Sequence, residues 1–268
     1  MFAIFILDNT LIEGVVFIAR ITVIINQKGG VGKTTTAHAL GTGLIKKGYK
    51  VLLVDTDPQG NVSHTMQADT IGKGLYEAMK EELPAVELIQ RTPQGDILPS
   101  TLLLTAADME FVSTGREYIL ETVLESVKNN YDYIVIDSPP QLGILTINAL
   151  VASDDVIIPM TADIYSLQGL NQLHSTINKV RKFCKKNIVI AGLLLTRYSD
   201  RTILSRELKE SVEAKARELD SRLYNAIIRE AVSIREAQTA RQSIFDYAPK
   251  SNPAVDYMDF VTEYLLKN

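Results

Sequence analysis

Two lysines and three glycines that lie close together in the sequence could hold a phosphate group. Residues 26–36 read Asn-Gln-Lys-Gly-Gly-Val-Gly-Lys-Thr-Thr-Thr. Glycines let the backbone bend sharply and bring its N–H groups close to an anion. In such a loop Lys33 would reach the β- and γ-phosphates of a nucleotide, and the Thr34 hydroxyl would be a Mg²⁺ ligand. The chemistry that this spacing predicts is the binding of a nucleoside triphosphate.

The segments on either side of the loop are those that a phosphate-binding loop needs. Residues 21–25 form a β-branched run that predicts a strand, and residues 35–47 are compatible with a helix. The helix N-terminus would add unpaired N–H groups and a partial positive charge. A Gly-rich turn with solvated lysines is the alternative interpretation, but it leaves the flanking strand and helix without a reason.

Two carboxylates are predicted to lie near the phosphates. Residues 51–55 form an apolar run that predicts a buried parallel strand, and Asp57 follows in a polar turn. Asp57 would then lie beyond the carboxyl end of a strand, where ligands bind in doubly wound sheets. The apolar run 131–137 ends on Asp137. An acid at that place, beside a phosphate-binding loop, holds Mg²⁺ directly or through water.

The rest of the chain continues the alternation of apolar runs and helix-compatible segments. Such an alternation predicts a parallel sheet covered on both faces. The predicted fold class is α/β: a single P-loop NTPase domain over residues 21–268, with a mostly parallel twisted sheet and helices on both faces. Further strands are expected at residues 95–99, 156–159, 188–195 and 224–228. Helical patterns cover residues 72–88, 102–127 with a break near Gly115, 166–183, 203–219 and 254–266, the last with an apolar stripe of Val255, Met258, Val261 and Leu265.

Charge is distributed unevenly along the chain. The 268 residues carry a formal net charge of −4, which argues weakly against a general nucleic-acid binder. Residues 176–250, however, contain 16 Lys and Arg and 9 Asp and Glu, a net charge of +7. A basic segment on an acidic protein predicts a local face for a polyanion. Solvated helix faces are the alternative explanation of the same charges.

The first residues differ from the rest of the chain. Residues 1–19 are apolar but carry Asp8 and Glu13 and have no basic n-region. They fit a signal peptide poorly and are too interrupted to span a bilayer. We interpret residues 1–20 as an N-terminal extension, or as the result of translation from an upstream start, and expect a cytoplasmic protein. The single cysteine, Cys184, excludes a disulfide framework and a Cys-based zinc or iron–sulfur site within one chain.

The loop departs from the usual G-x-x-x-x-G-K-[ST] pattern, because a second lysine, Lys28, precedes the glycine pair. This K-G-G-x-G-K-T form resembles the deviant Walker A loop of the ParA/MinD family. From about residue 21 to the C-terminus the chain is similar to ParA/Soj-type partition ATPases. The other strings that carry the resemblance are D-x-D-P-Q-G-N at 55–61, Y-D-Y-I-V-I-D-S-P-P at 131–140, S-L-Q-G-L at 166–170 and S-I-F-D-Y at 243–247.

The resemblance implies an ATPase with ATP and Mg²⁺ as cofactors and slow basal turnover. Lys28 would cross a dimer interface to the partner's nucleotide, and Asp57 would position the attacking water. The implied catalytic residues are Lys28, Lys33 and Asp57. The implied metal ligands are Thr34 and Asp137, the latter directly or through water. The implied nucleotide-binding residues are Lys28, Gly29, Gly30, Val31, Gly32, Lys33, Thr34 and Thr35.

DNA contacts are implied with two departures from the family pattern. Arg201 matches the arginine of the family's D-A-R-T turn, and Arg206 lies about one helical turn beyond. Where chromosomal members carry P-R-N-V-R-L-S-E-A, this chain has Arg229 for the proline and Ser233 for the second arginine. We expect Arg229 or Arg235 to substitute for it. These departures leave the adenine-contacting residues open and are compatible with a plasmid or mobile-element member.

The function that the resemblance implies is that of an ATP-dependent DNA-segregation ATPase, for a chromosome or a plasmid. An ATP-dependent homodimer would bind nonspecific double-stranded DNA at the nucleoid, and a ParB-type centromere-binding partner would stimulate hydrolysis. A MinD-like protein needs a basic amphipathic C-terminus, whereas the final helix carries Asp256, Asp259 and Glu263, so no membrane partner is expected. A nitrogenase-reductase relative needs more cysteines, and a tyrosine-kinase relative a Tyr-rich tail. A cargo-positioning scaffold with little turnover remains the non-enzymatic alternative.

Overall fold

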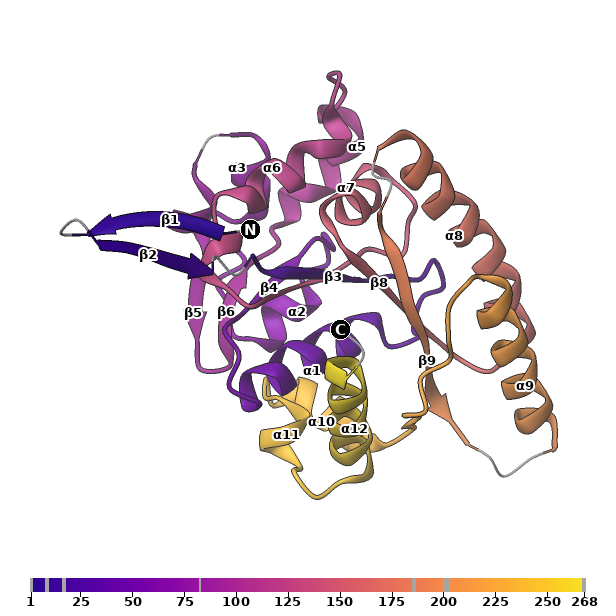
Figure 1. Cartoon of the computed structure of the whole chain (residues 1–268). Coiled ribbons are helices and arrows are strands. Elements are labelled where there is room, and N and C mark those ends of the chain that lie inside the picture. The colour runs from indigo at the N-terminus through magenta and orange to yellow at the C-terminus, as the bar shows by residue number, and fades with distance from the viewer. Residues whose placement is uncertain are drawn as a thin grey trace.

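The main element of the protein is an eight-stranded sheet (Figure 1). The computed structural model describes residues 2–7, 10–15, 18–81, 83–184, 187–199 and 203–266. The strand order is β10-β9-β8-β3-β7-β4-β6-β5, and each pairing is parallel except that of β5 with β6. The predicted mostly parallel sheet is therefore confirmed. The strands are β3 (Arg20–Ile24), β4 (Val51–Asp55), β5 (Gln90–Thr92), β6 (Gly95–Leu98), β7 (Tyr133–Asp137), β8 (Asp155–Met160), β9 (Val189–Tyr198) and β10 (Ile228–Arg229).

The central strands are mostly apolar because both faces of the sheet are covered, and their charged residues lie at the strand ends. Every residue of β4 and of β8 is buried, which is the pattern of parallel strands between two helical layers. In the pairing of β4 with β7, Asp55 lies opposite Asp137. The two strands that were expected to carry acids therefore end level with each other at one edge of the sheet.

Helices form a layer on each face of the sheet, as Figure 1 shows. Two separate clusters of buried apolar side chains fill the space between the sheet and these layers. On one face lie α3 (Leu75–Met79), α4 (Ala85–Leu88), α5 (Ala107–Glu110), α6 (Ile119–Glu125), α7 (Ile144–Ala152), α8 (Ile164–Phe183) and α9 (Ile203–Glu218). On the other face lie α1 (Lys33–Lys46), α2 (Asn61–Thr65), α10 (Val232–Thr239), α11 (Ile244–Tyr247) and α12 (Asn252–Leu266).

The apolar stripe expected on the last helix is only partly correct. Val261 is fully buried, and Met258 and Leu265 are partly buried against the same apolar cluster, but Val255 is 47% exposed. Three aromatic side chains of α12, Tyr257, Phe260 and Tyr264, are almost completely buried and belong to the core as well. Tyr257 and Tyr264 were not counted as apolar, yet each buries its ring and satisfies its hydroxyl. Tyr264 pairs with Thr22 of β3 at 2.7 Å, and Tyr257 pairs with Thr36 of α1 at 3.3 Å.

Two helical regions are more broken than their patterns predict. Residues 72–88 contain two short helices, α3 and α4, in place of one. Residues 102–127 contain short α and 3₁₀ segments, with the expected break at Gly115, whose φ is 84°. The expected strand at 224–228 is reduced to β10 and a single bridge between Leu193 and Leu223.

The N-terminal residues form a sheet of their own. β1 (Phe2–Leu7) and β2 (Thr10–Val15) pair with each other in antiparallel register and make up a two-stranded sheet apart from the main one (Figure 1). A boundary near residue 20 stays a prediction. Among the residues that the structure describes, no helix combines the length and the apolar character that crossing a bilayer requires.

Candidate functional site

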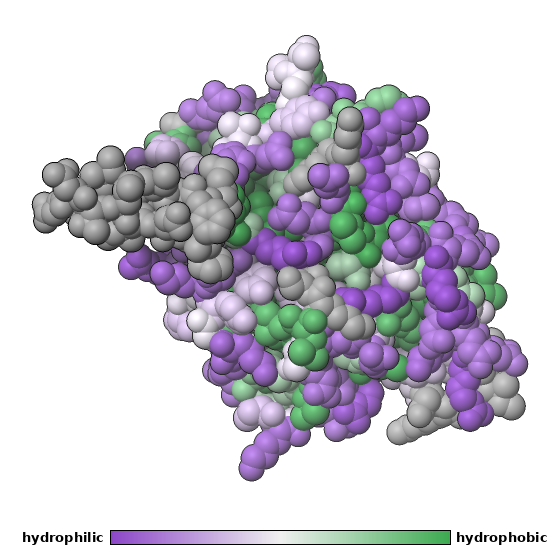
Figure 2. All heavy atoms as spheres, viewed as in Figure 1, coloured by the Kyte–Doolittle hydropathy of each residue, from purple (hydrophilic) through white to green (hydrophobic). Residues whose placement is uncertain are grey.

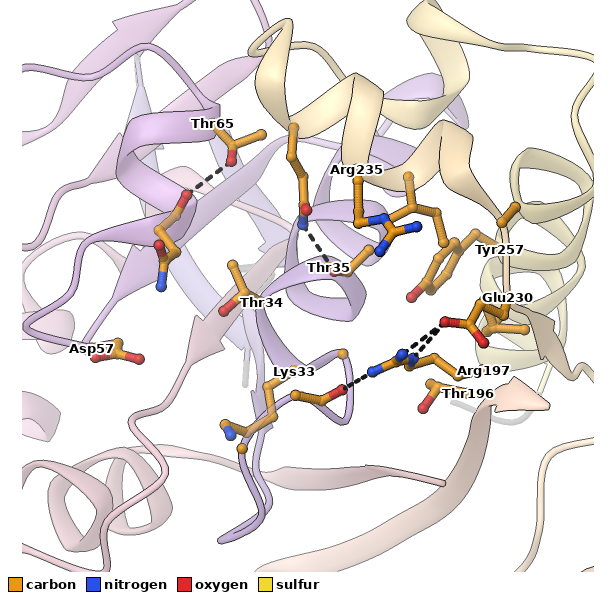
Figure 3. Close-up of a pocket in the computed structure, with 18 of the residues that line it drawn as sticks. Lys33, Thr34, Thr35, Asp57, Thr65, Thr196, Arg197, Glu230, Arg235 and Tyr257 are labelled. Carbon is orange, nitrogen blue, oxygen red and sulfur yellow. Dashed lines mark hydrogen bonds and ion pairs between the residues drawn. The ribbon is translucent and has the colours of Figure 1, made fainter. Parts of the chain in front are cut away.

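A pocket of about 810 Å³ opens at the carboxyl edge of the sheet (Figure 3). Its walls come from the loop before α1, the turn after β4, the end of β9, and the segment from β10 to α10. These segments are far apart in the sequence and meet because the carboxyl ends of parallel strands share one edge. The lining residues include Gly29, Gly30, Gly32, Lys33, Thr34, Thr35, Asp57, Thr196, Arg197, Glu230, Arg235, Gln238 and Tyr257.

The Gly-rich loop adopts the conformation that its glycines predict. Gly30 and Gly32 have φ values of 75° and 83°, which other residues rarely adopt. Lys33 is the first residue of α1 and is only 7% exposed. Its ammonium lies 3.2 Å from the carbonyl oxygen of Lys28, to which it donates. Burial lowers the pKa of Lys33, and the charges of Asp137 and Asp57 act in the opposite direction.

Thr34 and Asp137 meet as the metal assignment requires. The Thr34 hydroxyl donates to Oδ2 of Asp137 at 2.8 Å. The other oxygen of Asp137, Oδ1, is buried and has no hydrogen-bond partner in the described part of the chain. Burial, and then the charge of Asp55, raise the pKa of Asp137 well above its ordinary value. A divalent cation would supply both the missing partner and the missing positive charge, so these residues fit Mg²⁺.

The described residues do not form a metal site on their own. They contain no group of three or more His, Cys, Asp and Glu side chains that could hold an ion. Mg²⁺ demands near-octahedral oxygen coordination and is bound through one or two protein ligands, waters and substrate phosphates. A cation beside Thr34 and Asp137 would therefore depend on a nucleotide for part of its coordination.

Asp57 is held in a turn by three neighbours. Its backbone N–H donates to Oδ1 of Asp55 at 3.1 Å, and its own Oδ1 accepts from the Gln59 N–H at 3.0 Å. Its carbonyl oxygen accepts from the Ser100 hydroxyl at 2.6 Å. Asp57 lines the pocket and is 7% exposed. The side chain thus lies at the pocket wall on a turn that cannot move freely.

Asp55 anchors that turn from inside the sheet. Its Oδ2 accepts from both the N–H and the hydroxyl of Ser63 in α2, at 2.9 and 2.7 Å. Burial raises the pKa of Asp55 to about 6, although the Ser63 hydrogen bonds oppose this change. The D-x-D string therefore separates two tasks, since the first acid is structural and the second faces the pocket.

Lys28 does not point into the pocket of its own chain. Its ammonium lies 2.6 Å from Oδ2 of Asp163, and 3.4 Å from the hydroxyls of Thr161 and Ser166. Lys28 does not line the pocket described above. The Lys33 side chain therefore lines the pocket, whereas the Lys28 side chain contacts Asp163.

The far end of the pocket contains residues that the sequence did not single out. Arg197 donates to the carbonyl oxygen of Gly30 at 3.3 Å and pairs with Glu230 at 2.7 Å, as the dashed lines in Figure 3 show. Gln238 of α10 donates to the Thr35 hydroxyl at 3.0 Å. The position of Arg197 at the carboxyl end of β9 was a usable signal, since ligands bind at such ends.

Three of the four arginines expected to contact DNA are described by the structure, and they lie on different elements. Arg201 lies outside the described residues. Arg206 is exposed on α9, and Arg229 and Arg235 line the pocket. Arg229 is engaged by Asp256, with its closest contact at 2.6 Å. The sides of α8 and α9 that face the viewer are strongly hydrophilic in Figure 2.

A parallel α/β sheet with a lysine-bearing loop before α1 and an acid at the end of β7 defines the class of P-loop ATPases. A family model described as an AAA domain matches residues 19–190. The Sporulation initiation inhibitor protein Soj of Bacillus subtilis is 41% identical over 91% of this chain and 97% of its own. The chain belongs to this family, that of the ParA/Soj partition ATPases.

Two further relatives support that membership. The Chromosome partitioning protein ParA of Caulobacter vibrioides is 36% identical, over 92% of this chain and 94% of its own. A solved structure of a plasmid partition protein from Borrelia burgdorferi, bound to AMPPNP, is 28% identical with a TM-score of 0.81. The match covers 93% of this chain and 100% of that one. The sequence resemblance to the family and the predicted P-loop fold are thus both confirmed.

Proposed function

We propose that this protein is an ATP-dependent DNA-segregation ATPase whose nucleotide lies in the pocket before α1. The observation that carries the proposal is the contact of Thr34 with Asp137 close to Lys33. It leaves the second, buried oxygen of Asp137 without a hydrogen-bond partner among the described residues. That arrangement calls for a cation and a phosphate together. The relatives named Soj and ParA supply the biological role, and the AMPPNP of the Borrelia structure supports ATP as the nucleotide.

ATP would lie with its phosphates in the loop and its nucleoside toward Arg197 and Gln238. The backbone N–H groups of the loop and of the first turn of α1 would surround the β-phosphate, and Lys33 would turn from the Lys28 carbonyl to the phosphates. Mg²⁺ would neutralise charge on the β- and γ-phosphates. The nucleotide-binding set is Lys28, Gly29, Gly30, Val31, Gly32, Lys33, Thr34 and Thr35, with Thr34 and Asp137 at the metal.

Asp57 would position the water that attacks the γ-phosphate. The turn that carries it is fixed through Asp55, Ser63 and Ser100, so the carboxylate is preorganised. Positioning and electrostatic stabilisation supply most of the catalysis in phosphoryl transfer. A second subunit would add Lys28 to the charge around the phosphates, which makes the active form an ATP-bridged homodimer with slow basal turnover.

The same dimer would present its basic surface to nonspecific double-stranded DNA. Arg201, Arg206, Arg229 and Arg235 remain the proposed contacts, and Arg235 is better placed than Arg229, which Asp256 already engages. A ParB-type centromere-binding partner would stimulate hydrolysis and so release the DNA. The protein would then act in the cytoplasm, on the nucleoid.

The test compares ATP hydrolysis and sedimentation of the wild-type chain with those of Asp57→Ala and Lys28→Ala. We expect Asp57→Ala to bind ATP and to remain dimeric with at least a roughly tenfold lower rate, because the water is no longer positioned while the phosphates and the metal are still held. Lys28→Ala should bind nucleotide but fail to dimerise. An Asp57→Ala variant that hydrolyses at the wild-type rate would remove that residue from the mechanism.

A cargo-positioning scaffold is the second candidate function. It would also bind ATP, but DNA and a partner would leave its turnover unchanged. Measuring hydrolysis with random duplex DNA and with a candidate centromere-binding protein separates the two.

A further inference from the structure

We propose that Asp163 is a positioning residue for Lys28, which it retains on its own subunit until the triphosphate of a second subunit competes for the lysine. The inference rests on the proposed function in one respect, the destination of Lys28 in the dimer. The resting contact itself is independent of that assignment.

The contact is built from three side chains between the end of β8 and the first turn of α8. Asp163 accepts from the Lys28 ammonium at 2.6 Å, and the Thr161 and Ser166 hydroxyls lie 3.4 Å from the same nitrogen. Both hydroxyls also donate to Oδ2 of Asp163. The lysine therefore has a defined place on its own chain.

A second interaction, the capping of α8, holds the Asp163 side chain in place. It is the N-cap of α8, and its Oδ1 accepts from the Ser166 N–H at 2.9 Å. Burial raises the pKa of Asp163, but the hydrogen bonds from Lys28, Thr161 and Ser166 outweigh burial and hold that pKa below its ordinary value. Its carboxylate is thus charged throughout the neutral range, and competition between anions, not protonation, releases Lys28.

The strength of the contact suits a reversible restraint. The side chains of Lys28 and Asp163 are 38% and 32% exposed. Ion pairs of this exposure contribute at most a few-fold to an equilibrium constant. A triphosphate carries more negative charge than one carboxylate, so it would displace Asp163 from Lys28. Until then, the contact with Asp163 would raise the ATP concentration that is needed for dimerisation.

The variant that tests the proposal is Asp163→Asn. Asparagine caps helices as well as aspartate does, so α8 keeps its first turn while the charge is removed. The matched control is Asp246→Asn, which removes the ion pair with Lys46, also 2.6 Å long, on the other helical layer. Circular dichroism melting confirms that both variants fold.

The first measurement needs no nucleotide. Lysines of the full chain are acetylated with an amine-reactive ester, and mass spectrometry follows the rate at each site. We expect Lys28 to react roughly two- to five-fold faster in Asp163→Asn, which is the effect of removing a half-exposed ion pair. In Asp246→Asn the rate at Lys28 should stay at the wild-type value. An unchanged rate at Lys28 in Asp163→Asn overturns the proposal.

The second measurement is sedimentation with AMPPNP. Asp163→Asn should reach half-maximal dimer at a roughly two- to five-fold lower AMPPNP concentration than the wild type. Equal or weaker dimerisation with faster acetylation would refute the restraint on Lys28. If Lys28→Ala dimerises normally, the bridging role in the proposed function fails, whereas the acetylation rates still decide whether Asp163 holds the lysine.

Discussion

Asp137 shows how one side chain prepares the site for a ligand. Its Oδ1 is buried without a partner among the described residues, and an unmet buried acceptor costs about 1–3 kcal/mol. A cation beside this oxygen, as we propose, would recover that free energy. The raised pKa of Asp137 has the same origin, because burial and the charge of Asp55 disfavour a lone carboxylate. At the proposed metal site, both features would make binding of a cation stabilise the fold around Asp137.

His38 gives a prediction at the same scale. It lies in α1, it pairs with Gln94 at 3.0 Å, and burial lowers its pKa to about 4. The unfolded chain takes up a proton near pH 6.5, whereas the folded chain does so only near pH 4. Neutral His38 therefore makes its full contribution to the free energy of unfolding above pH 6.5, and this contribution is lost as the pH falls toward 4.

The measurement compares urea unfolding of the wild type and His38→Gln at several pH values. Between pH 6.5 and pH 5 we expect the wild type to lose about 1.6 kcal/mol more than the variant. Over this range the unfolded chain takes up the His38 proton and the folded chain does not, which costs up to about 1.36 kcal/mol per pH unit. Parallel pH profiles of the two proteins would show that His38 titrates normally. NMR titration of its ring provides an independent reading.

At the residue scale, the sequence predicted which side chains gather at the site better than it predicted the contacts that those side chains make without a ligand. Lys33, Thr34, Asp57 and Asp137 lie around one edge of the sheet because the motifs carry local geometry. For Lys28 the sequence predicted only a contact with the nucleotide of another subunit. Its contact with Asp163 was not predicted, because the two residues are separated by 135 positions and only the pairing of β3 with β8 brings them together.

At the scale of elements, the packing of α1 on the sheet depends on a glycine. A Cβ atom on Gly41 would lie 2.6 Å from Cδ1 of Leu53, whose side chain is fully buried in β4. Because protein interiors are close-packed, either the Leu53 side chain or the helix would have to shift. α1 begins at the phosphate-binding loop, so a shift of the helix would also disturb the site.

We expect Gly41→Ala to destabilise the fold by about 1–3 kcal/mol through overpacking. The matched control is Gly169→Ala in α8, where a Cβ would meet nothing within 4 Å. That change should stabilise by up to about 1 kcal/mol, since alanine is the better helix former. Urea unfolding of both variants checks the prediction, and equal effects would contradict it.

The elements that the sequence missed have physical reasons for being hidden. β5 contains Gln90, Arg91 and Thr92 at the edge of the sheet, where no apolar pattern is required. The residues of α10 were matched to a family motif and were not predicted to be helical. The helix has one fully buried apolar side chain, Ala237, so it shows no apolar stripe in the sequence. The central strands were found because complete burial demands uninterrupted apolar runs.

At the scale of the whole molecule, the charge is unevenly distributed along the chain, because the +7 segment of residues 176–250 includes the basic end of α8, all of α9 and all of α10. Two copies of this segment in the proposed dimer would roughly double the number of phosphates neutralised, and log K falls with log salt in proportion to that number. DNA binding should therefore require ATP, ignore sequence and weaken steeply with salt.

Fluorescence anisotropy with random duplex DNA across a salt series, with ATP and with ADP, measures this dependence. Arg206→Ala and Arg201→Ala should weaken binding on all sequences and flatten the log–log slope by about 0.9 for each phosphate that the variant no longer neutralises. Lys46→Ala is the charge-matched control on α1 and should leave the slope unchanged. Equal affinity with ATP and ADP would contradict the assignment.

The main sheet ends in very short strands, three residues in β5 and two in β10. Long exposed edges offer rows of unpaired backbone groups to other chains and invite aggregation. If many copies gather on one DNA molecule, as the proposed function implies, their high local concentration would favour such pairing. Short edges leave little backbone for another chain to extend, so they would help to keep that crowding reversible.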